Sequence, residues 1–256
     1  MAIPKAASQD GSMPLTGHLK ELRNRLLICV VPFVGLSAAF IPMADRLMKL
    51  LTDMGKQFGY RYIYLAPQEL LIEYLRIAVL GAFLCCLPLI LFQIWSFARP
   101  GLDKGEKRMF GFSMVFGLLC FCVGVLFAYK VTVPFMLQFL IGLSSKTVSA
   151  AISIEKYTCF LLTVFLIFGI IFELPLVSVV LTNLGLIQAS WLVKARKPAI
   201  VVSFVVAALI TPPDIFSQIM VALPIILLYQ VSIWLSALFE KLRKKREAEE
   251  EAAGAL

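Results

Sequence analysis

One carboxylate stands out among the side chains that could do chemistry, because Glu173 lies inside a long apolar run, 157–182. An ionised carboxylate at the centre of a bilayer costs about 2.5–3.5 kcal/mol, so such residues face protein or water and are usually functional. Pro175 follows two positions later and has no N–H for the carbonyl of Ile171, which predicts a bend with local hydration. The alternative is an acid that is hydrogen-bonded within its own helix bundle.

The residue groups that support catalysis or metal binding are missing from the sequence. The chain has one histidine, no P-loop and no HExxH motif. An intramembrane hydrolase would need a second membrane carboxylate or a Ser/His pair at matching depth, and the sequence has neither. All six cysteines lie in apolar runs, where a thiol behaves as a small hydrophobe. We therefore expect no catalytic residue, no cofactor, no disulfide framework and no metal site.

The composition is that of a chain embedded in lipid. Of the 256 residues, 60% are apolar and only 16% are charged, and the mean hydropathy is +0.89. The formal net charge is +8, but Lys and Arg fall in short clusters between apolar runs, as in membrane-facing loops. We therefore expect no nucleic-acid partner. The first 25 residues have no apolar core, so the first span is expected to serve as an uncleaved insertion signal.

The apolar runs predict a single-domain, all-α membrane protein with six transmembrane helices, of which the fifth and sixth are short. A hydrocarbon core about 30 Å thick needs roughly 20 apolar residues of helix. The expected spans are about 26–44, 77–97, 110–129, 157–182, 198–210 and 215–239. Pro212 and Pro213 forbid a continuous helix between the last two, which we read as a short hairpin. One broken helix, giving five spans, is the alternative.

Basic residues predict that both termini lie in the cytoplasm. The loops 98–109 and 184–198 carry 7 Lys and Arg in 27 residues, whereas the loops 45–76 and 130–156 carry 8 in 59. Cytoplasmic loops are the ones enriched in basic residues. The tail, 241–256, is expected to be a solvated helix whose basic start lies at the anionic leaflet.

Four stretches of the sequence together resemble one known family. They are HLKELRNR before the first span, WSFARPGLDKGEKR in the first internal loop, FELP in the fourth span and TPPDIFSQ between the fifth and sixth. In order and spacing they are similar to the TatC family, the multispanning receptor subunit of the twin-arginine protein translocase. The stretch LAPQELLIEYLR, with Pro67, also resembles the family's segment before the second span, although Leu70 and Leu71 stand where aromatics are common.

The resemblance implies a signal-peptide site with two carboxylates. In the TatC family, the glutamate of HLxELR and the glutamate after PGL contact the signal, and Glu21 and Glu106 match them. A twin-arginine signal presents two guanidinium groups, each a planar fork of donors that suits a carboxylate. Read without the family, Glu21 is a helix-surface partner of Arg25, and Glu106 is a solvated loop acid.

The same resemblance assigns further residues around this site. Arg23 resembles a residue that shapes it, and Leu102 belongs to the loop motif. Phe97 offers an aromatic surface at the interface, or alternatively serves only to end the helix. Pro100 and Gly101 end the second helix and fix the turn that presents the loop glutamate.

Three polar residues at membrane depth are assigned to partner binding. The resemblance places Glu173 on the concave face where small single-span proteins meet TatC, and it ties Asp214 and Gln218 to function. Asp214 also precedes the sixth span and can act as its N-cap, and both roles can hold at once.

The implied function is Sec-independent protein export. The chain is expected to bind twin-arginine signal peptides of folded precursors and to associate with TatA-like and TatB-like proteins, with copies of itself and with the lipid bilayer. Export would use the proton-motive force. The expected location is the bacterial inner membrane, with the plastid thylakoid as the less favoured alternative, and no enzyme activity is expected. The rival is a proton-coupled transporter, which would need repeated halves and several facing membrane polar groups; the sequence shows neither.

Overall fold

The computed structural model describes residues 15–98, 104–142, 151–211 and 214–254. In chain order, its elements are α1 (Leu15–Phe40), the 3-10 turn η1 (Ile41–Met43), α2 (Ala44–Lys56), β1 (Arg61–Ile63), α3 (Glu69–Ala98), α4 (Lys104–Phe127), the π turn η3 (Ala128–Thr132), α5 (Val133–Gly142), β2 (Ala151–Ser153), α6 (Ile154–Ile171), α7 (Leu174–Asn183), α8 (Ala189–Lys194), α9 (Arg196–Ile210) and α10 (Ile215–Gly254). The described chain is therefore mostly helical.

Five helical stretches in the described residues are long and apolar enough to cross a membrane. They are Lys20–Lys56, Glu69–Ile94, Ser113–Gly142, Ile154–Asn183 and Ile215–Lys245. At 15 residues, α9 is shorter than any of these. This set of apolar helices is that of a multipass membrane protein.

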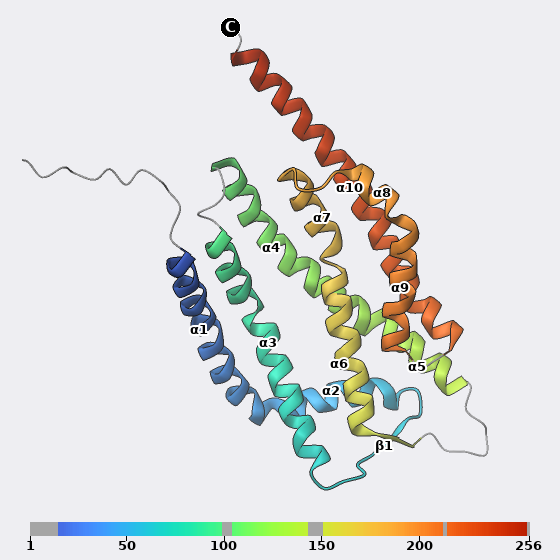
Figure 1. The fold of residues 1–256 in the computed structure, drawn as a ribbon. Coiled ribbons are helices and arrows are strands. Elements are labelled where there is room, and N and C mark those ends of the chain that lie inside the picture. Colours follow the sequence, from blue (N-terminus) through green and yellow to red (C-terminus); the bar gives the residue numbers. More distant parts are fainter. Residues whose placement is uncertain (1–14, 99–103, 143–150, 212–213, 255–256) are drawn as a thin grey trace, which may run out of the picture.

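The helices pack in pairs that leave two distinct ends (Figure 1). The contacts join α1 to α3, α4 to α6, and α10 to both α7 and α9. At one end lie α2 and a two-stranded sheet in which β1 pairs in parallel with β2, Arg61 opposite Ala151. The start of α1, the start of α4, the α7–α8 turn and the end of α10 lie at the other end.

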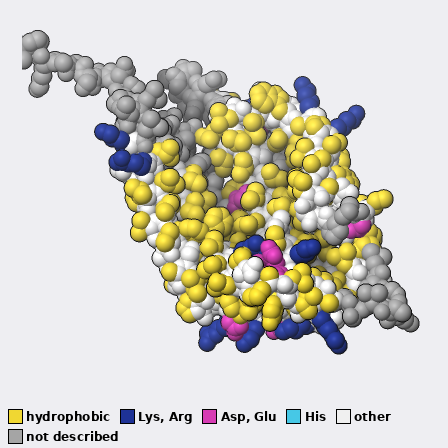
Figure 2. Space-filling model, turned by 60° about the horizontal axis from the view of Figure 1, so that its bottom comes forward, with side chains coloured by type: hydrophobic (Ala, Val, Ile, Leu, Met, Phe, Trp, Pro, Cys, Tyr) yellow, Lys and Arg dark blue, Asp and Glu magenta, His cyan; other side chains and the backbone are white. Residues whose placement is uncertain are grey.

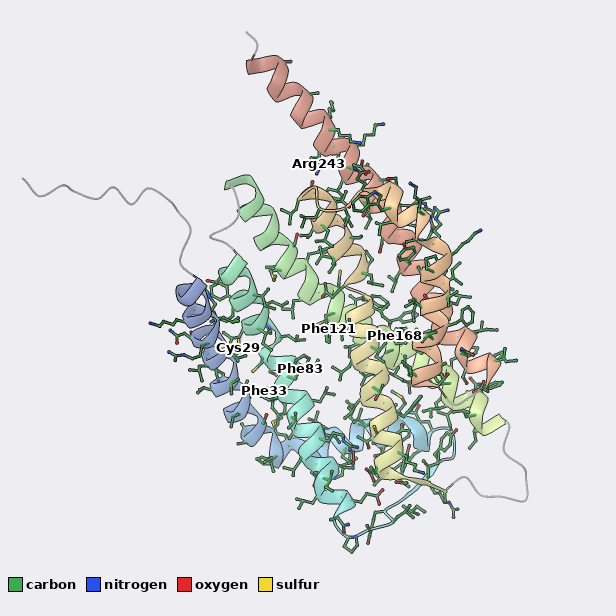
Figure 3. The ribbon with its side chains drawn as sticks, in the orientation of Figure 1. Cys29, Phe33, Phe83, Phe121, Phe168 and Arg243 are labelled. Carbon is green, nitrogen blue, oxygen red and sulfur yellow. The ribbon has the colours of Figure 1, made fainter. Side chains whose placement is uncertain are left out.

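Helix α6 forms the centre of the core. Its Leu161, Val164 and Phe168 are fully buried. Two glycines allow α4 and α6 to approach closely (Figure 3): a Cβ on Gly124 would lie 2.6 Å from the carbonyl oxygen of Phe168, and a Cβ on Gly169 would lie 2.5 Å from the ring of Phe121. Small residues serve this purpose where helices pack in lipid.

Hydrophobic side chains cover most of the surface shown in Figure 2, whereas Lys and Arg gather in a few groups. Leu209 and Ile215 are 81% and 78% exposed. Apolar side chains of this kind are stable facing lipid, because the lipid tails shield them from water without any packing against other helices.

Helix α2 is amphipathic and lies across one end of the bundle. It buries Ala44, Met48 and Leu51, while its outer face carries the ion pair between Lys49 Nζ and Asp45 Oδ2 at 3.0 Å. Beside it, the hydroxyl of Tyr60 donates to the carbonyl oxygen of Leu137 at 3.1 Å, and burial raises the pKa of this phenol. The element closes the end of the bundle.

Three helix boundaries in the structure can be compared with those expected from the sequence. The segment 130–142, expected in an external loop, is helical, because the π turn η3 accommodates Pro134 and α5 buries Val133, Met136 and Leu137. The expected bend near Pro175 is present as a break at 172–173 between α6 and α7. The sixth span was expected to be short and to end near 239, but α10 passes Pro224 unbroken and extends to Gly254, and its stretch Ile215–Lys245 is long and apolar enough to cross a membrane.

Candidate functional site

Glu21 lies on the second turn of α1 and is paired with Arg25, as the spacing in the sequence allows. Nε and Nη2 of Arg25 donate to the same oxygen, Glu21 Oε1, at 3.1 and 2.5 Å. The two side chains are only 25% and 19% exposed, so this pair is better shielded than an open surface pair. The Oε2 atom of Glu21 accepts no hydrogen bond from any residue that the structure describes.

Arg25 also ties α1 to the end of α3. Its Nη1 donates to Gln93 Oε1 at 3.2 Å, and its Nη2 donates to the carbonyl oxygen of Ser96 at 3.0 Å. Ser96 is two residues from the end of α3, where the last carbonyls have no helical partner of their own. One guanidinium therefore sets the position of Glu21 relative to the start of the α3–α4 connection.

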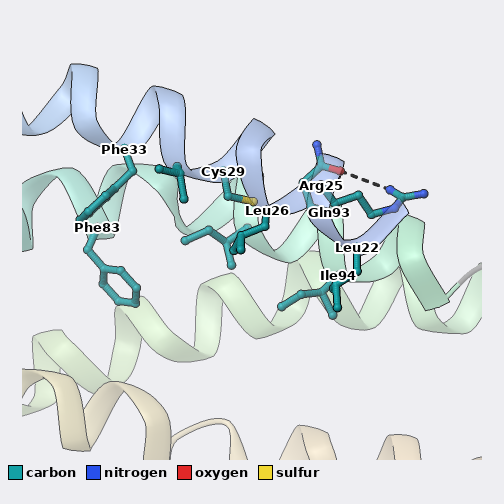
Figure 4. Close-up of a pocket in the computed structure, with 10 residues that line it drawn as sticks. Leu22, Arg25, Leu26, Cys29, Phe33, Phe83, Gln93 and Ile94 are labelled. Carbon is teal, nitrogen blue, oxygen red and sulfur yellow. Dashed lines mark hydrogen bonds between the residues drawn. The ribbon is translucent and has the colours of Figure 1, made fainter. Parts of the chain in front are cut away.

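An apolar groove of about 380 Å³ runs between α1 and α3 from this contact toward the middle of the helices (Figure 4). Arg25 and Gln93 are its polar residues. The remaining lining is apolar: Leu22, Leu26, Cys29, Val30, Phe33, Phe83, Ile90 and Ile94.

The loop residues expected at this site lie mostly outside the described part of the chain. Helix α3 ends at Ala98 and α4 begins at Lys104, so Glu106 falls in the first turn of α4. Pro100, Gly101 and Leu102 lie outside the described residues, as do the side chains of Phe97 and Glu106. Arg23 is described and is exposed on α1.

Glu173 stands at the break between α6 and α7 and lines a second, larger cavity. This cavity measures about 410 Å³ and lies between α3, α4 and α7; its other lining residues include Ser113, Gly117, Leu118 and Val177. Phe83 lines both this cavity and the groove beneath Arg25. The two cavities are therefore neighbours that share Phe83, and Glu173 lines only the second while Arg25 lines only the first.

Asp214 and Gln218 hold the start of α10. The expected N-cap contact is present, because Ser217 N donates to Asp214 Oδ1 at 2.7 Å. Gln218 Nε2 donates to the carbonyl oxygen of Phe204 on α9 at 3.0 Å. Pro212 and Pro213 lie outside the described residues, between the two helices. These contacts make α9 and α10 one packed hairpin.

Sequence reasoning missed an acidic cluster around the start of α3. Glu69 accepts from the backbone N–H groups of Leu65 and Ala66 at 2.5 and 3.3 Å, and from the hydroxyl of Ser153 and the N–H of Glu155 across the bundle end. Glu73, one turn on, is fully buried and accepts from Arg76 Nη1 at 2.6 Å. The turn with Pro67 just before Glu69 was the local sequence feature that could have indicated the contacts to Leu65 and Ala66.

A second missed contact fixes the turn between α7 and α8. Arg243 of α10 donates from Nη1 to the carbonyl oxygen of Thr182 at 3.1 Å (Figure 3), and Glu240 accepts from the N–H of Ala189 at 2.8 Å. Gly185 has φ +74°, and a Cβ there would lie 2.6 Å from Arg243 Nη1. The positive φ favours glycine at this position, whereas the contact is with the mobile end of the Arg243 side chain.

No group of three or more His, Cys, Asp or Glu side chains in the described ranges could hold a metal ion. The half-buried carboxylate of Glu21 is suited to binding a cation. Glu173, in its apolar cavity, is suited to hydrogen bonding with another helix.

Comparisons with known proteins give a single answer. The family model described as Sec-independent protein translocase protein (TatC) matches residues 17–224. A TatC of Desulforapulum autotrophicum is 37% identical over 253 residues, covering 96% of this chain and 91% of that protein. A TatC of Aquifex aeolicus is 38% identical over 240 residues, covering 92% of this chain and 98% of that one. A crystal structure titled as the twin-arginine translocase receptor TatC superposes with a TM-score of 0.78 at 35% identity, covering 87% of this chain and 99% of that one.

Proposed function

This chain belongs to the TatC family of Sec-independent protein translocase proteins, and from this we propose that Glu21 and Glu106 receive the arginine pair of twin-arginine signal peptides. The observation that carries the proposal is the position of Glu21: a half-buried carboxylate with one unbonded oxygen among the described residues, at the mouth of an apolar groove. Arg23, Phe97 and Leu102 are proposed to complete the site.

The groove between α1 and α3 suits the second part of such a ligand. A signal peptide has a basic segment followed by an apolar stretch of 7–15 residues. The charged pair would meet Glu21 at the mouth, and the apolar stretch would lie against Leu22, Leu26 and Ile94 along the groove. Each charge-assisted hydrogen bond contributes about 1.5–3 kcal/mol, and apolar burial adds to it.

The Glu173 cavity is proposed as the contact for single-span partners of the TatA and TatB type. A carboxylate in an apolar cavity favours a neighbour with a hydrogen-bond donor, because the apolar lining offers it few partners. Asp214 and Gln218 are proposed to serve the same partners from the α9–α10 hairpin. Self-association in the receptor complex belongs to the same proposal.

The proposed topology has six spans, with α9 as a short fifth and both termini in the cytoplasm of a bacterium. Its support is the basic content of the segments at one end of the bundle, including Lys194, Arg196 and Lys197 around α8 and the start of α9. Short helices cross where the bilayer thins or neighbours cover them. Export across this inner membrane would use the proton-motive force.

The test is co-purification with a folded precursor. Membranes containing the chain are solubilised with a precursor whose signal carries Arg-Arg, or with the same precursor carrying Lys-Lys. We expect only the Arg-Arg form to be retained, because the ammonium group cannot form the bidentate contact. Equal retention of both forms would refute the proposal.

A further inference from the structure

The structure contains a guanidinium already seated on the carboxylate that the signal is proposed to use. Two donors of Arg25 converge on Oε1 of Glu21, at 3.1 and 2.5 Å. This is the same chemistry that an incoming arginine would offer. A ligand that takes both oxygens of Glu21 must therefore replace Arg25 on one of them.

We propose that Arg25 is an internal competitor for Glu21 and that this competition sets the discrimination between arginine and lysine in the signal. The inference rests on the proposed function, since it assumes that Glu21 receives the arginine pair. An arginine brings a planar fork that matches the contact it displaces. A lysine brings a compact, strongly hydrated ammonium, which cannot match that geometry and so competes poorly.

Arg25 keeps other hydrogen-bond acceptors when Glu21 binds a ligand instead of Arg25. Gln93 Oε1 and the carbonyl oxygen of Ser96, both on α3, bind its Nη1 and Nη2 at 3.2 and 3.0 Å. These bonds do not involve Glu21, so the exchange leaves the Arg25 guanidinium partly satisfied rather than stranded in a half-buried position. The contact with α3 thereby lowers the cost of release.

The free oxygen gives the ligand a first contact. Oε2 of Glu21 has no hydrogen-bond donor among the described residues, so a guanidinium can bind there before Arg25 is displaced from Oε1. Before displacement, the positive charge of Arg25 reduces the attraction of the carboxylate for any cation. Without Arg25, both peptides would bind more tightly by the same factor, so at a fixed peptide concentration a lysine signal would also be captured and the selectivity of capture would fall.

The competing explanation is that Arg25 only orients Glu21. The two explanations predict opposite results for Arg25→Gln, which removes the charge but keeps a side chain able to hydrogen bond. If Arg25 competes, Arg25→Gln increases capture of lysine signals. If Arg25 only orients, the variant weakens capture of arginine signals and leaves the ratio unchanged.

The experiment measures photo-crosslinking of two synthetic signal peptides, Arg-Arg and Lys-Lys, to membranes carrying the full chain at matched levels. Glu21→Ala is measured first and should reduce Arg-Arg capture roughly ten-fold; normal capture in this variant would refute the proposed site itself. We expect Arg25→Gln to raise Lys-Lys capture about five-fold, which corresponds to roughly one net hydrogen bond, with a smaller change for Arg-Arg. Arg25→Lys should fall between wild type and Arg25→Gln.

Gln93→Ala is the matched control, because it removes a contact between α1 and α3 while leaving the Arg25–Glu21 pair intact. Because Gln93 is also an acceptor that Arg25 keeps when it leaves Glu21, we expect lower capture of both peptides and no rise in the share of Lys-Lys capture. A ratio in Gln93→Ala that falls as in Arg25→Gln would overturn the inference, since loosening of α1 against α3 would then explain both. So would an Arg25→Gln variant that loses Arg-Arg capture at a constant ratio.

Discussion

Gly117 of α4 leaves the space that the carboxylate of Glu173 occupies: a Cβ on this glycine would lie 3.0 Å from Oε2 and 3.4 Å from Oε1. The next nearest atom is Leu176 Cδ2, also at 3.0 Å. All three atoms are at the ends of side chains, so a methyl group could be accommodated by small rotations, whereas a larger side chain would displace the carboxylate from the cavity.

Gly117→Leu should therefore reproduce the loss of Glu173. We expect assembly with TatA-type and TatB-type partners to fall roughly five-fold or more, which corresponds to about 1 kcal/mol, while signal-peptide crosslinking is kept. Gly35→Leu is the control, because a Cβ on Gly35 of α1 meets nothing within 4 Å. Equal assembly in the two leucine variants would show that the position of the carboxylate does not matter.

Direct substitution of Glu173 tests the same site. Glu173→Ala should keep signal binding and weaken partner assembly, because Glu173 lines a cavity other than the one beneath Glu21. Glu173→Gln should be milder, since an amide can still hydrogen bond to a partner helix. If wild type, Ala and Gln variants assemble and export alike, the buried acid is only structural.

Glu69 is expected to hold the end of the bundle that contains α2. Its carboxylate accepts from four donors on two segments, so Glu69→Ala should lower the free energy of unfolding in detergent by at least about 2 kcal/mol. Gln68→Ala, the exposed neighbour, should change it little. A Glu69→Ala variant whose free energy of unfolding equals that of wild type would mean that water replaces these contacts.

Cysteine labelling tests the proposed topology. Gly59 is the obvious position on the α2–β1 turn, but its φ of +86° makes a cysteine there strained, so we choose the exposed Gln57 instead. In a chain whose six native cysteines are replaced by alanine, an impermeant thiol reagent added outside should label Gln57→Cys and not Lys194→Cys. The reverse pattern would place Glu21 on the wrong side for a cytoplasmic signal.

Local contacts could be predicted from the sequence, and contacts between distant segments could not. The Glu21–Arg25 pair and the Asp214 cap are set by spacings of four and three residues, and both are present. The bonds from Arg25 to Gln93 and Ser96 join positions about 70 residues apart, and no periodicity in the sequence indicates them.

The same distinction explains the acids that were missed. Glu69 and Glu73 were expected in an external loop. The partners of Glu69, Ser153 and Glu155, come from a segment more than 80 residues away, whereas Glu73 pairs with Arg76 on its own helix. The pairing of β1 with β2 and the packing of α3 against α6 bring these segments together. Likewise, the run 130–142 was expected in an external loop, yet the π turn η3 continues the helix past Pro134 into α5.

The most direct test of the proposed function is crosslinking of a twin-arginine signal peptide to membranes carrying single variants of the three acids near the proposed site, at equal expression. Glu21→Ala and Glu106→Ala should each reduce crosslinking roughly ten-fold, Glu106→Asp should be intermediate, and Glu106→Lys should be worse because it repels the arginine pair. Asp103→Ala should change little, because Asp103 is a neighbouring acid that the resemblance does not match to a signal contact. An Asp103 variant as defective as the Glu106 variant would show that general loop charge does the recognition, and normal crosslinking in the Glu21, Glu106 double variant would contradict the proposed site altogether.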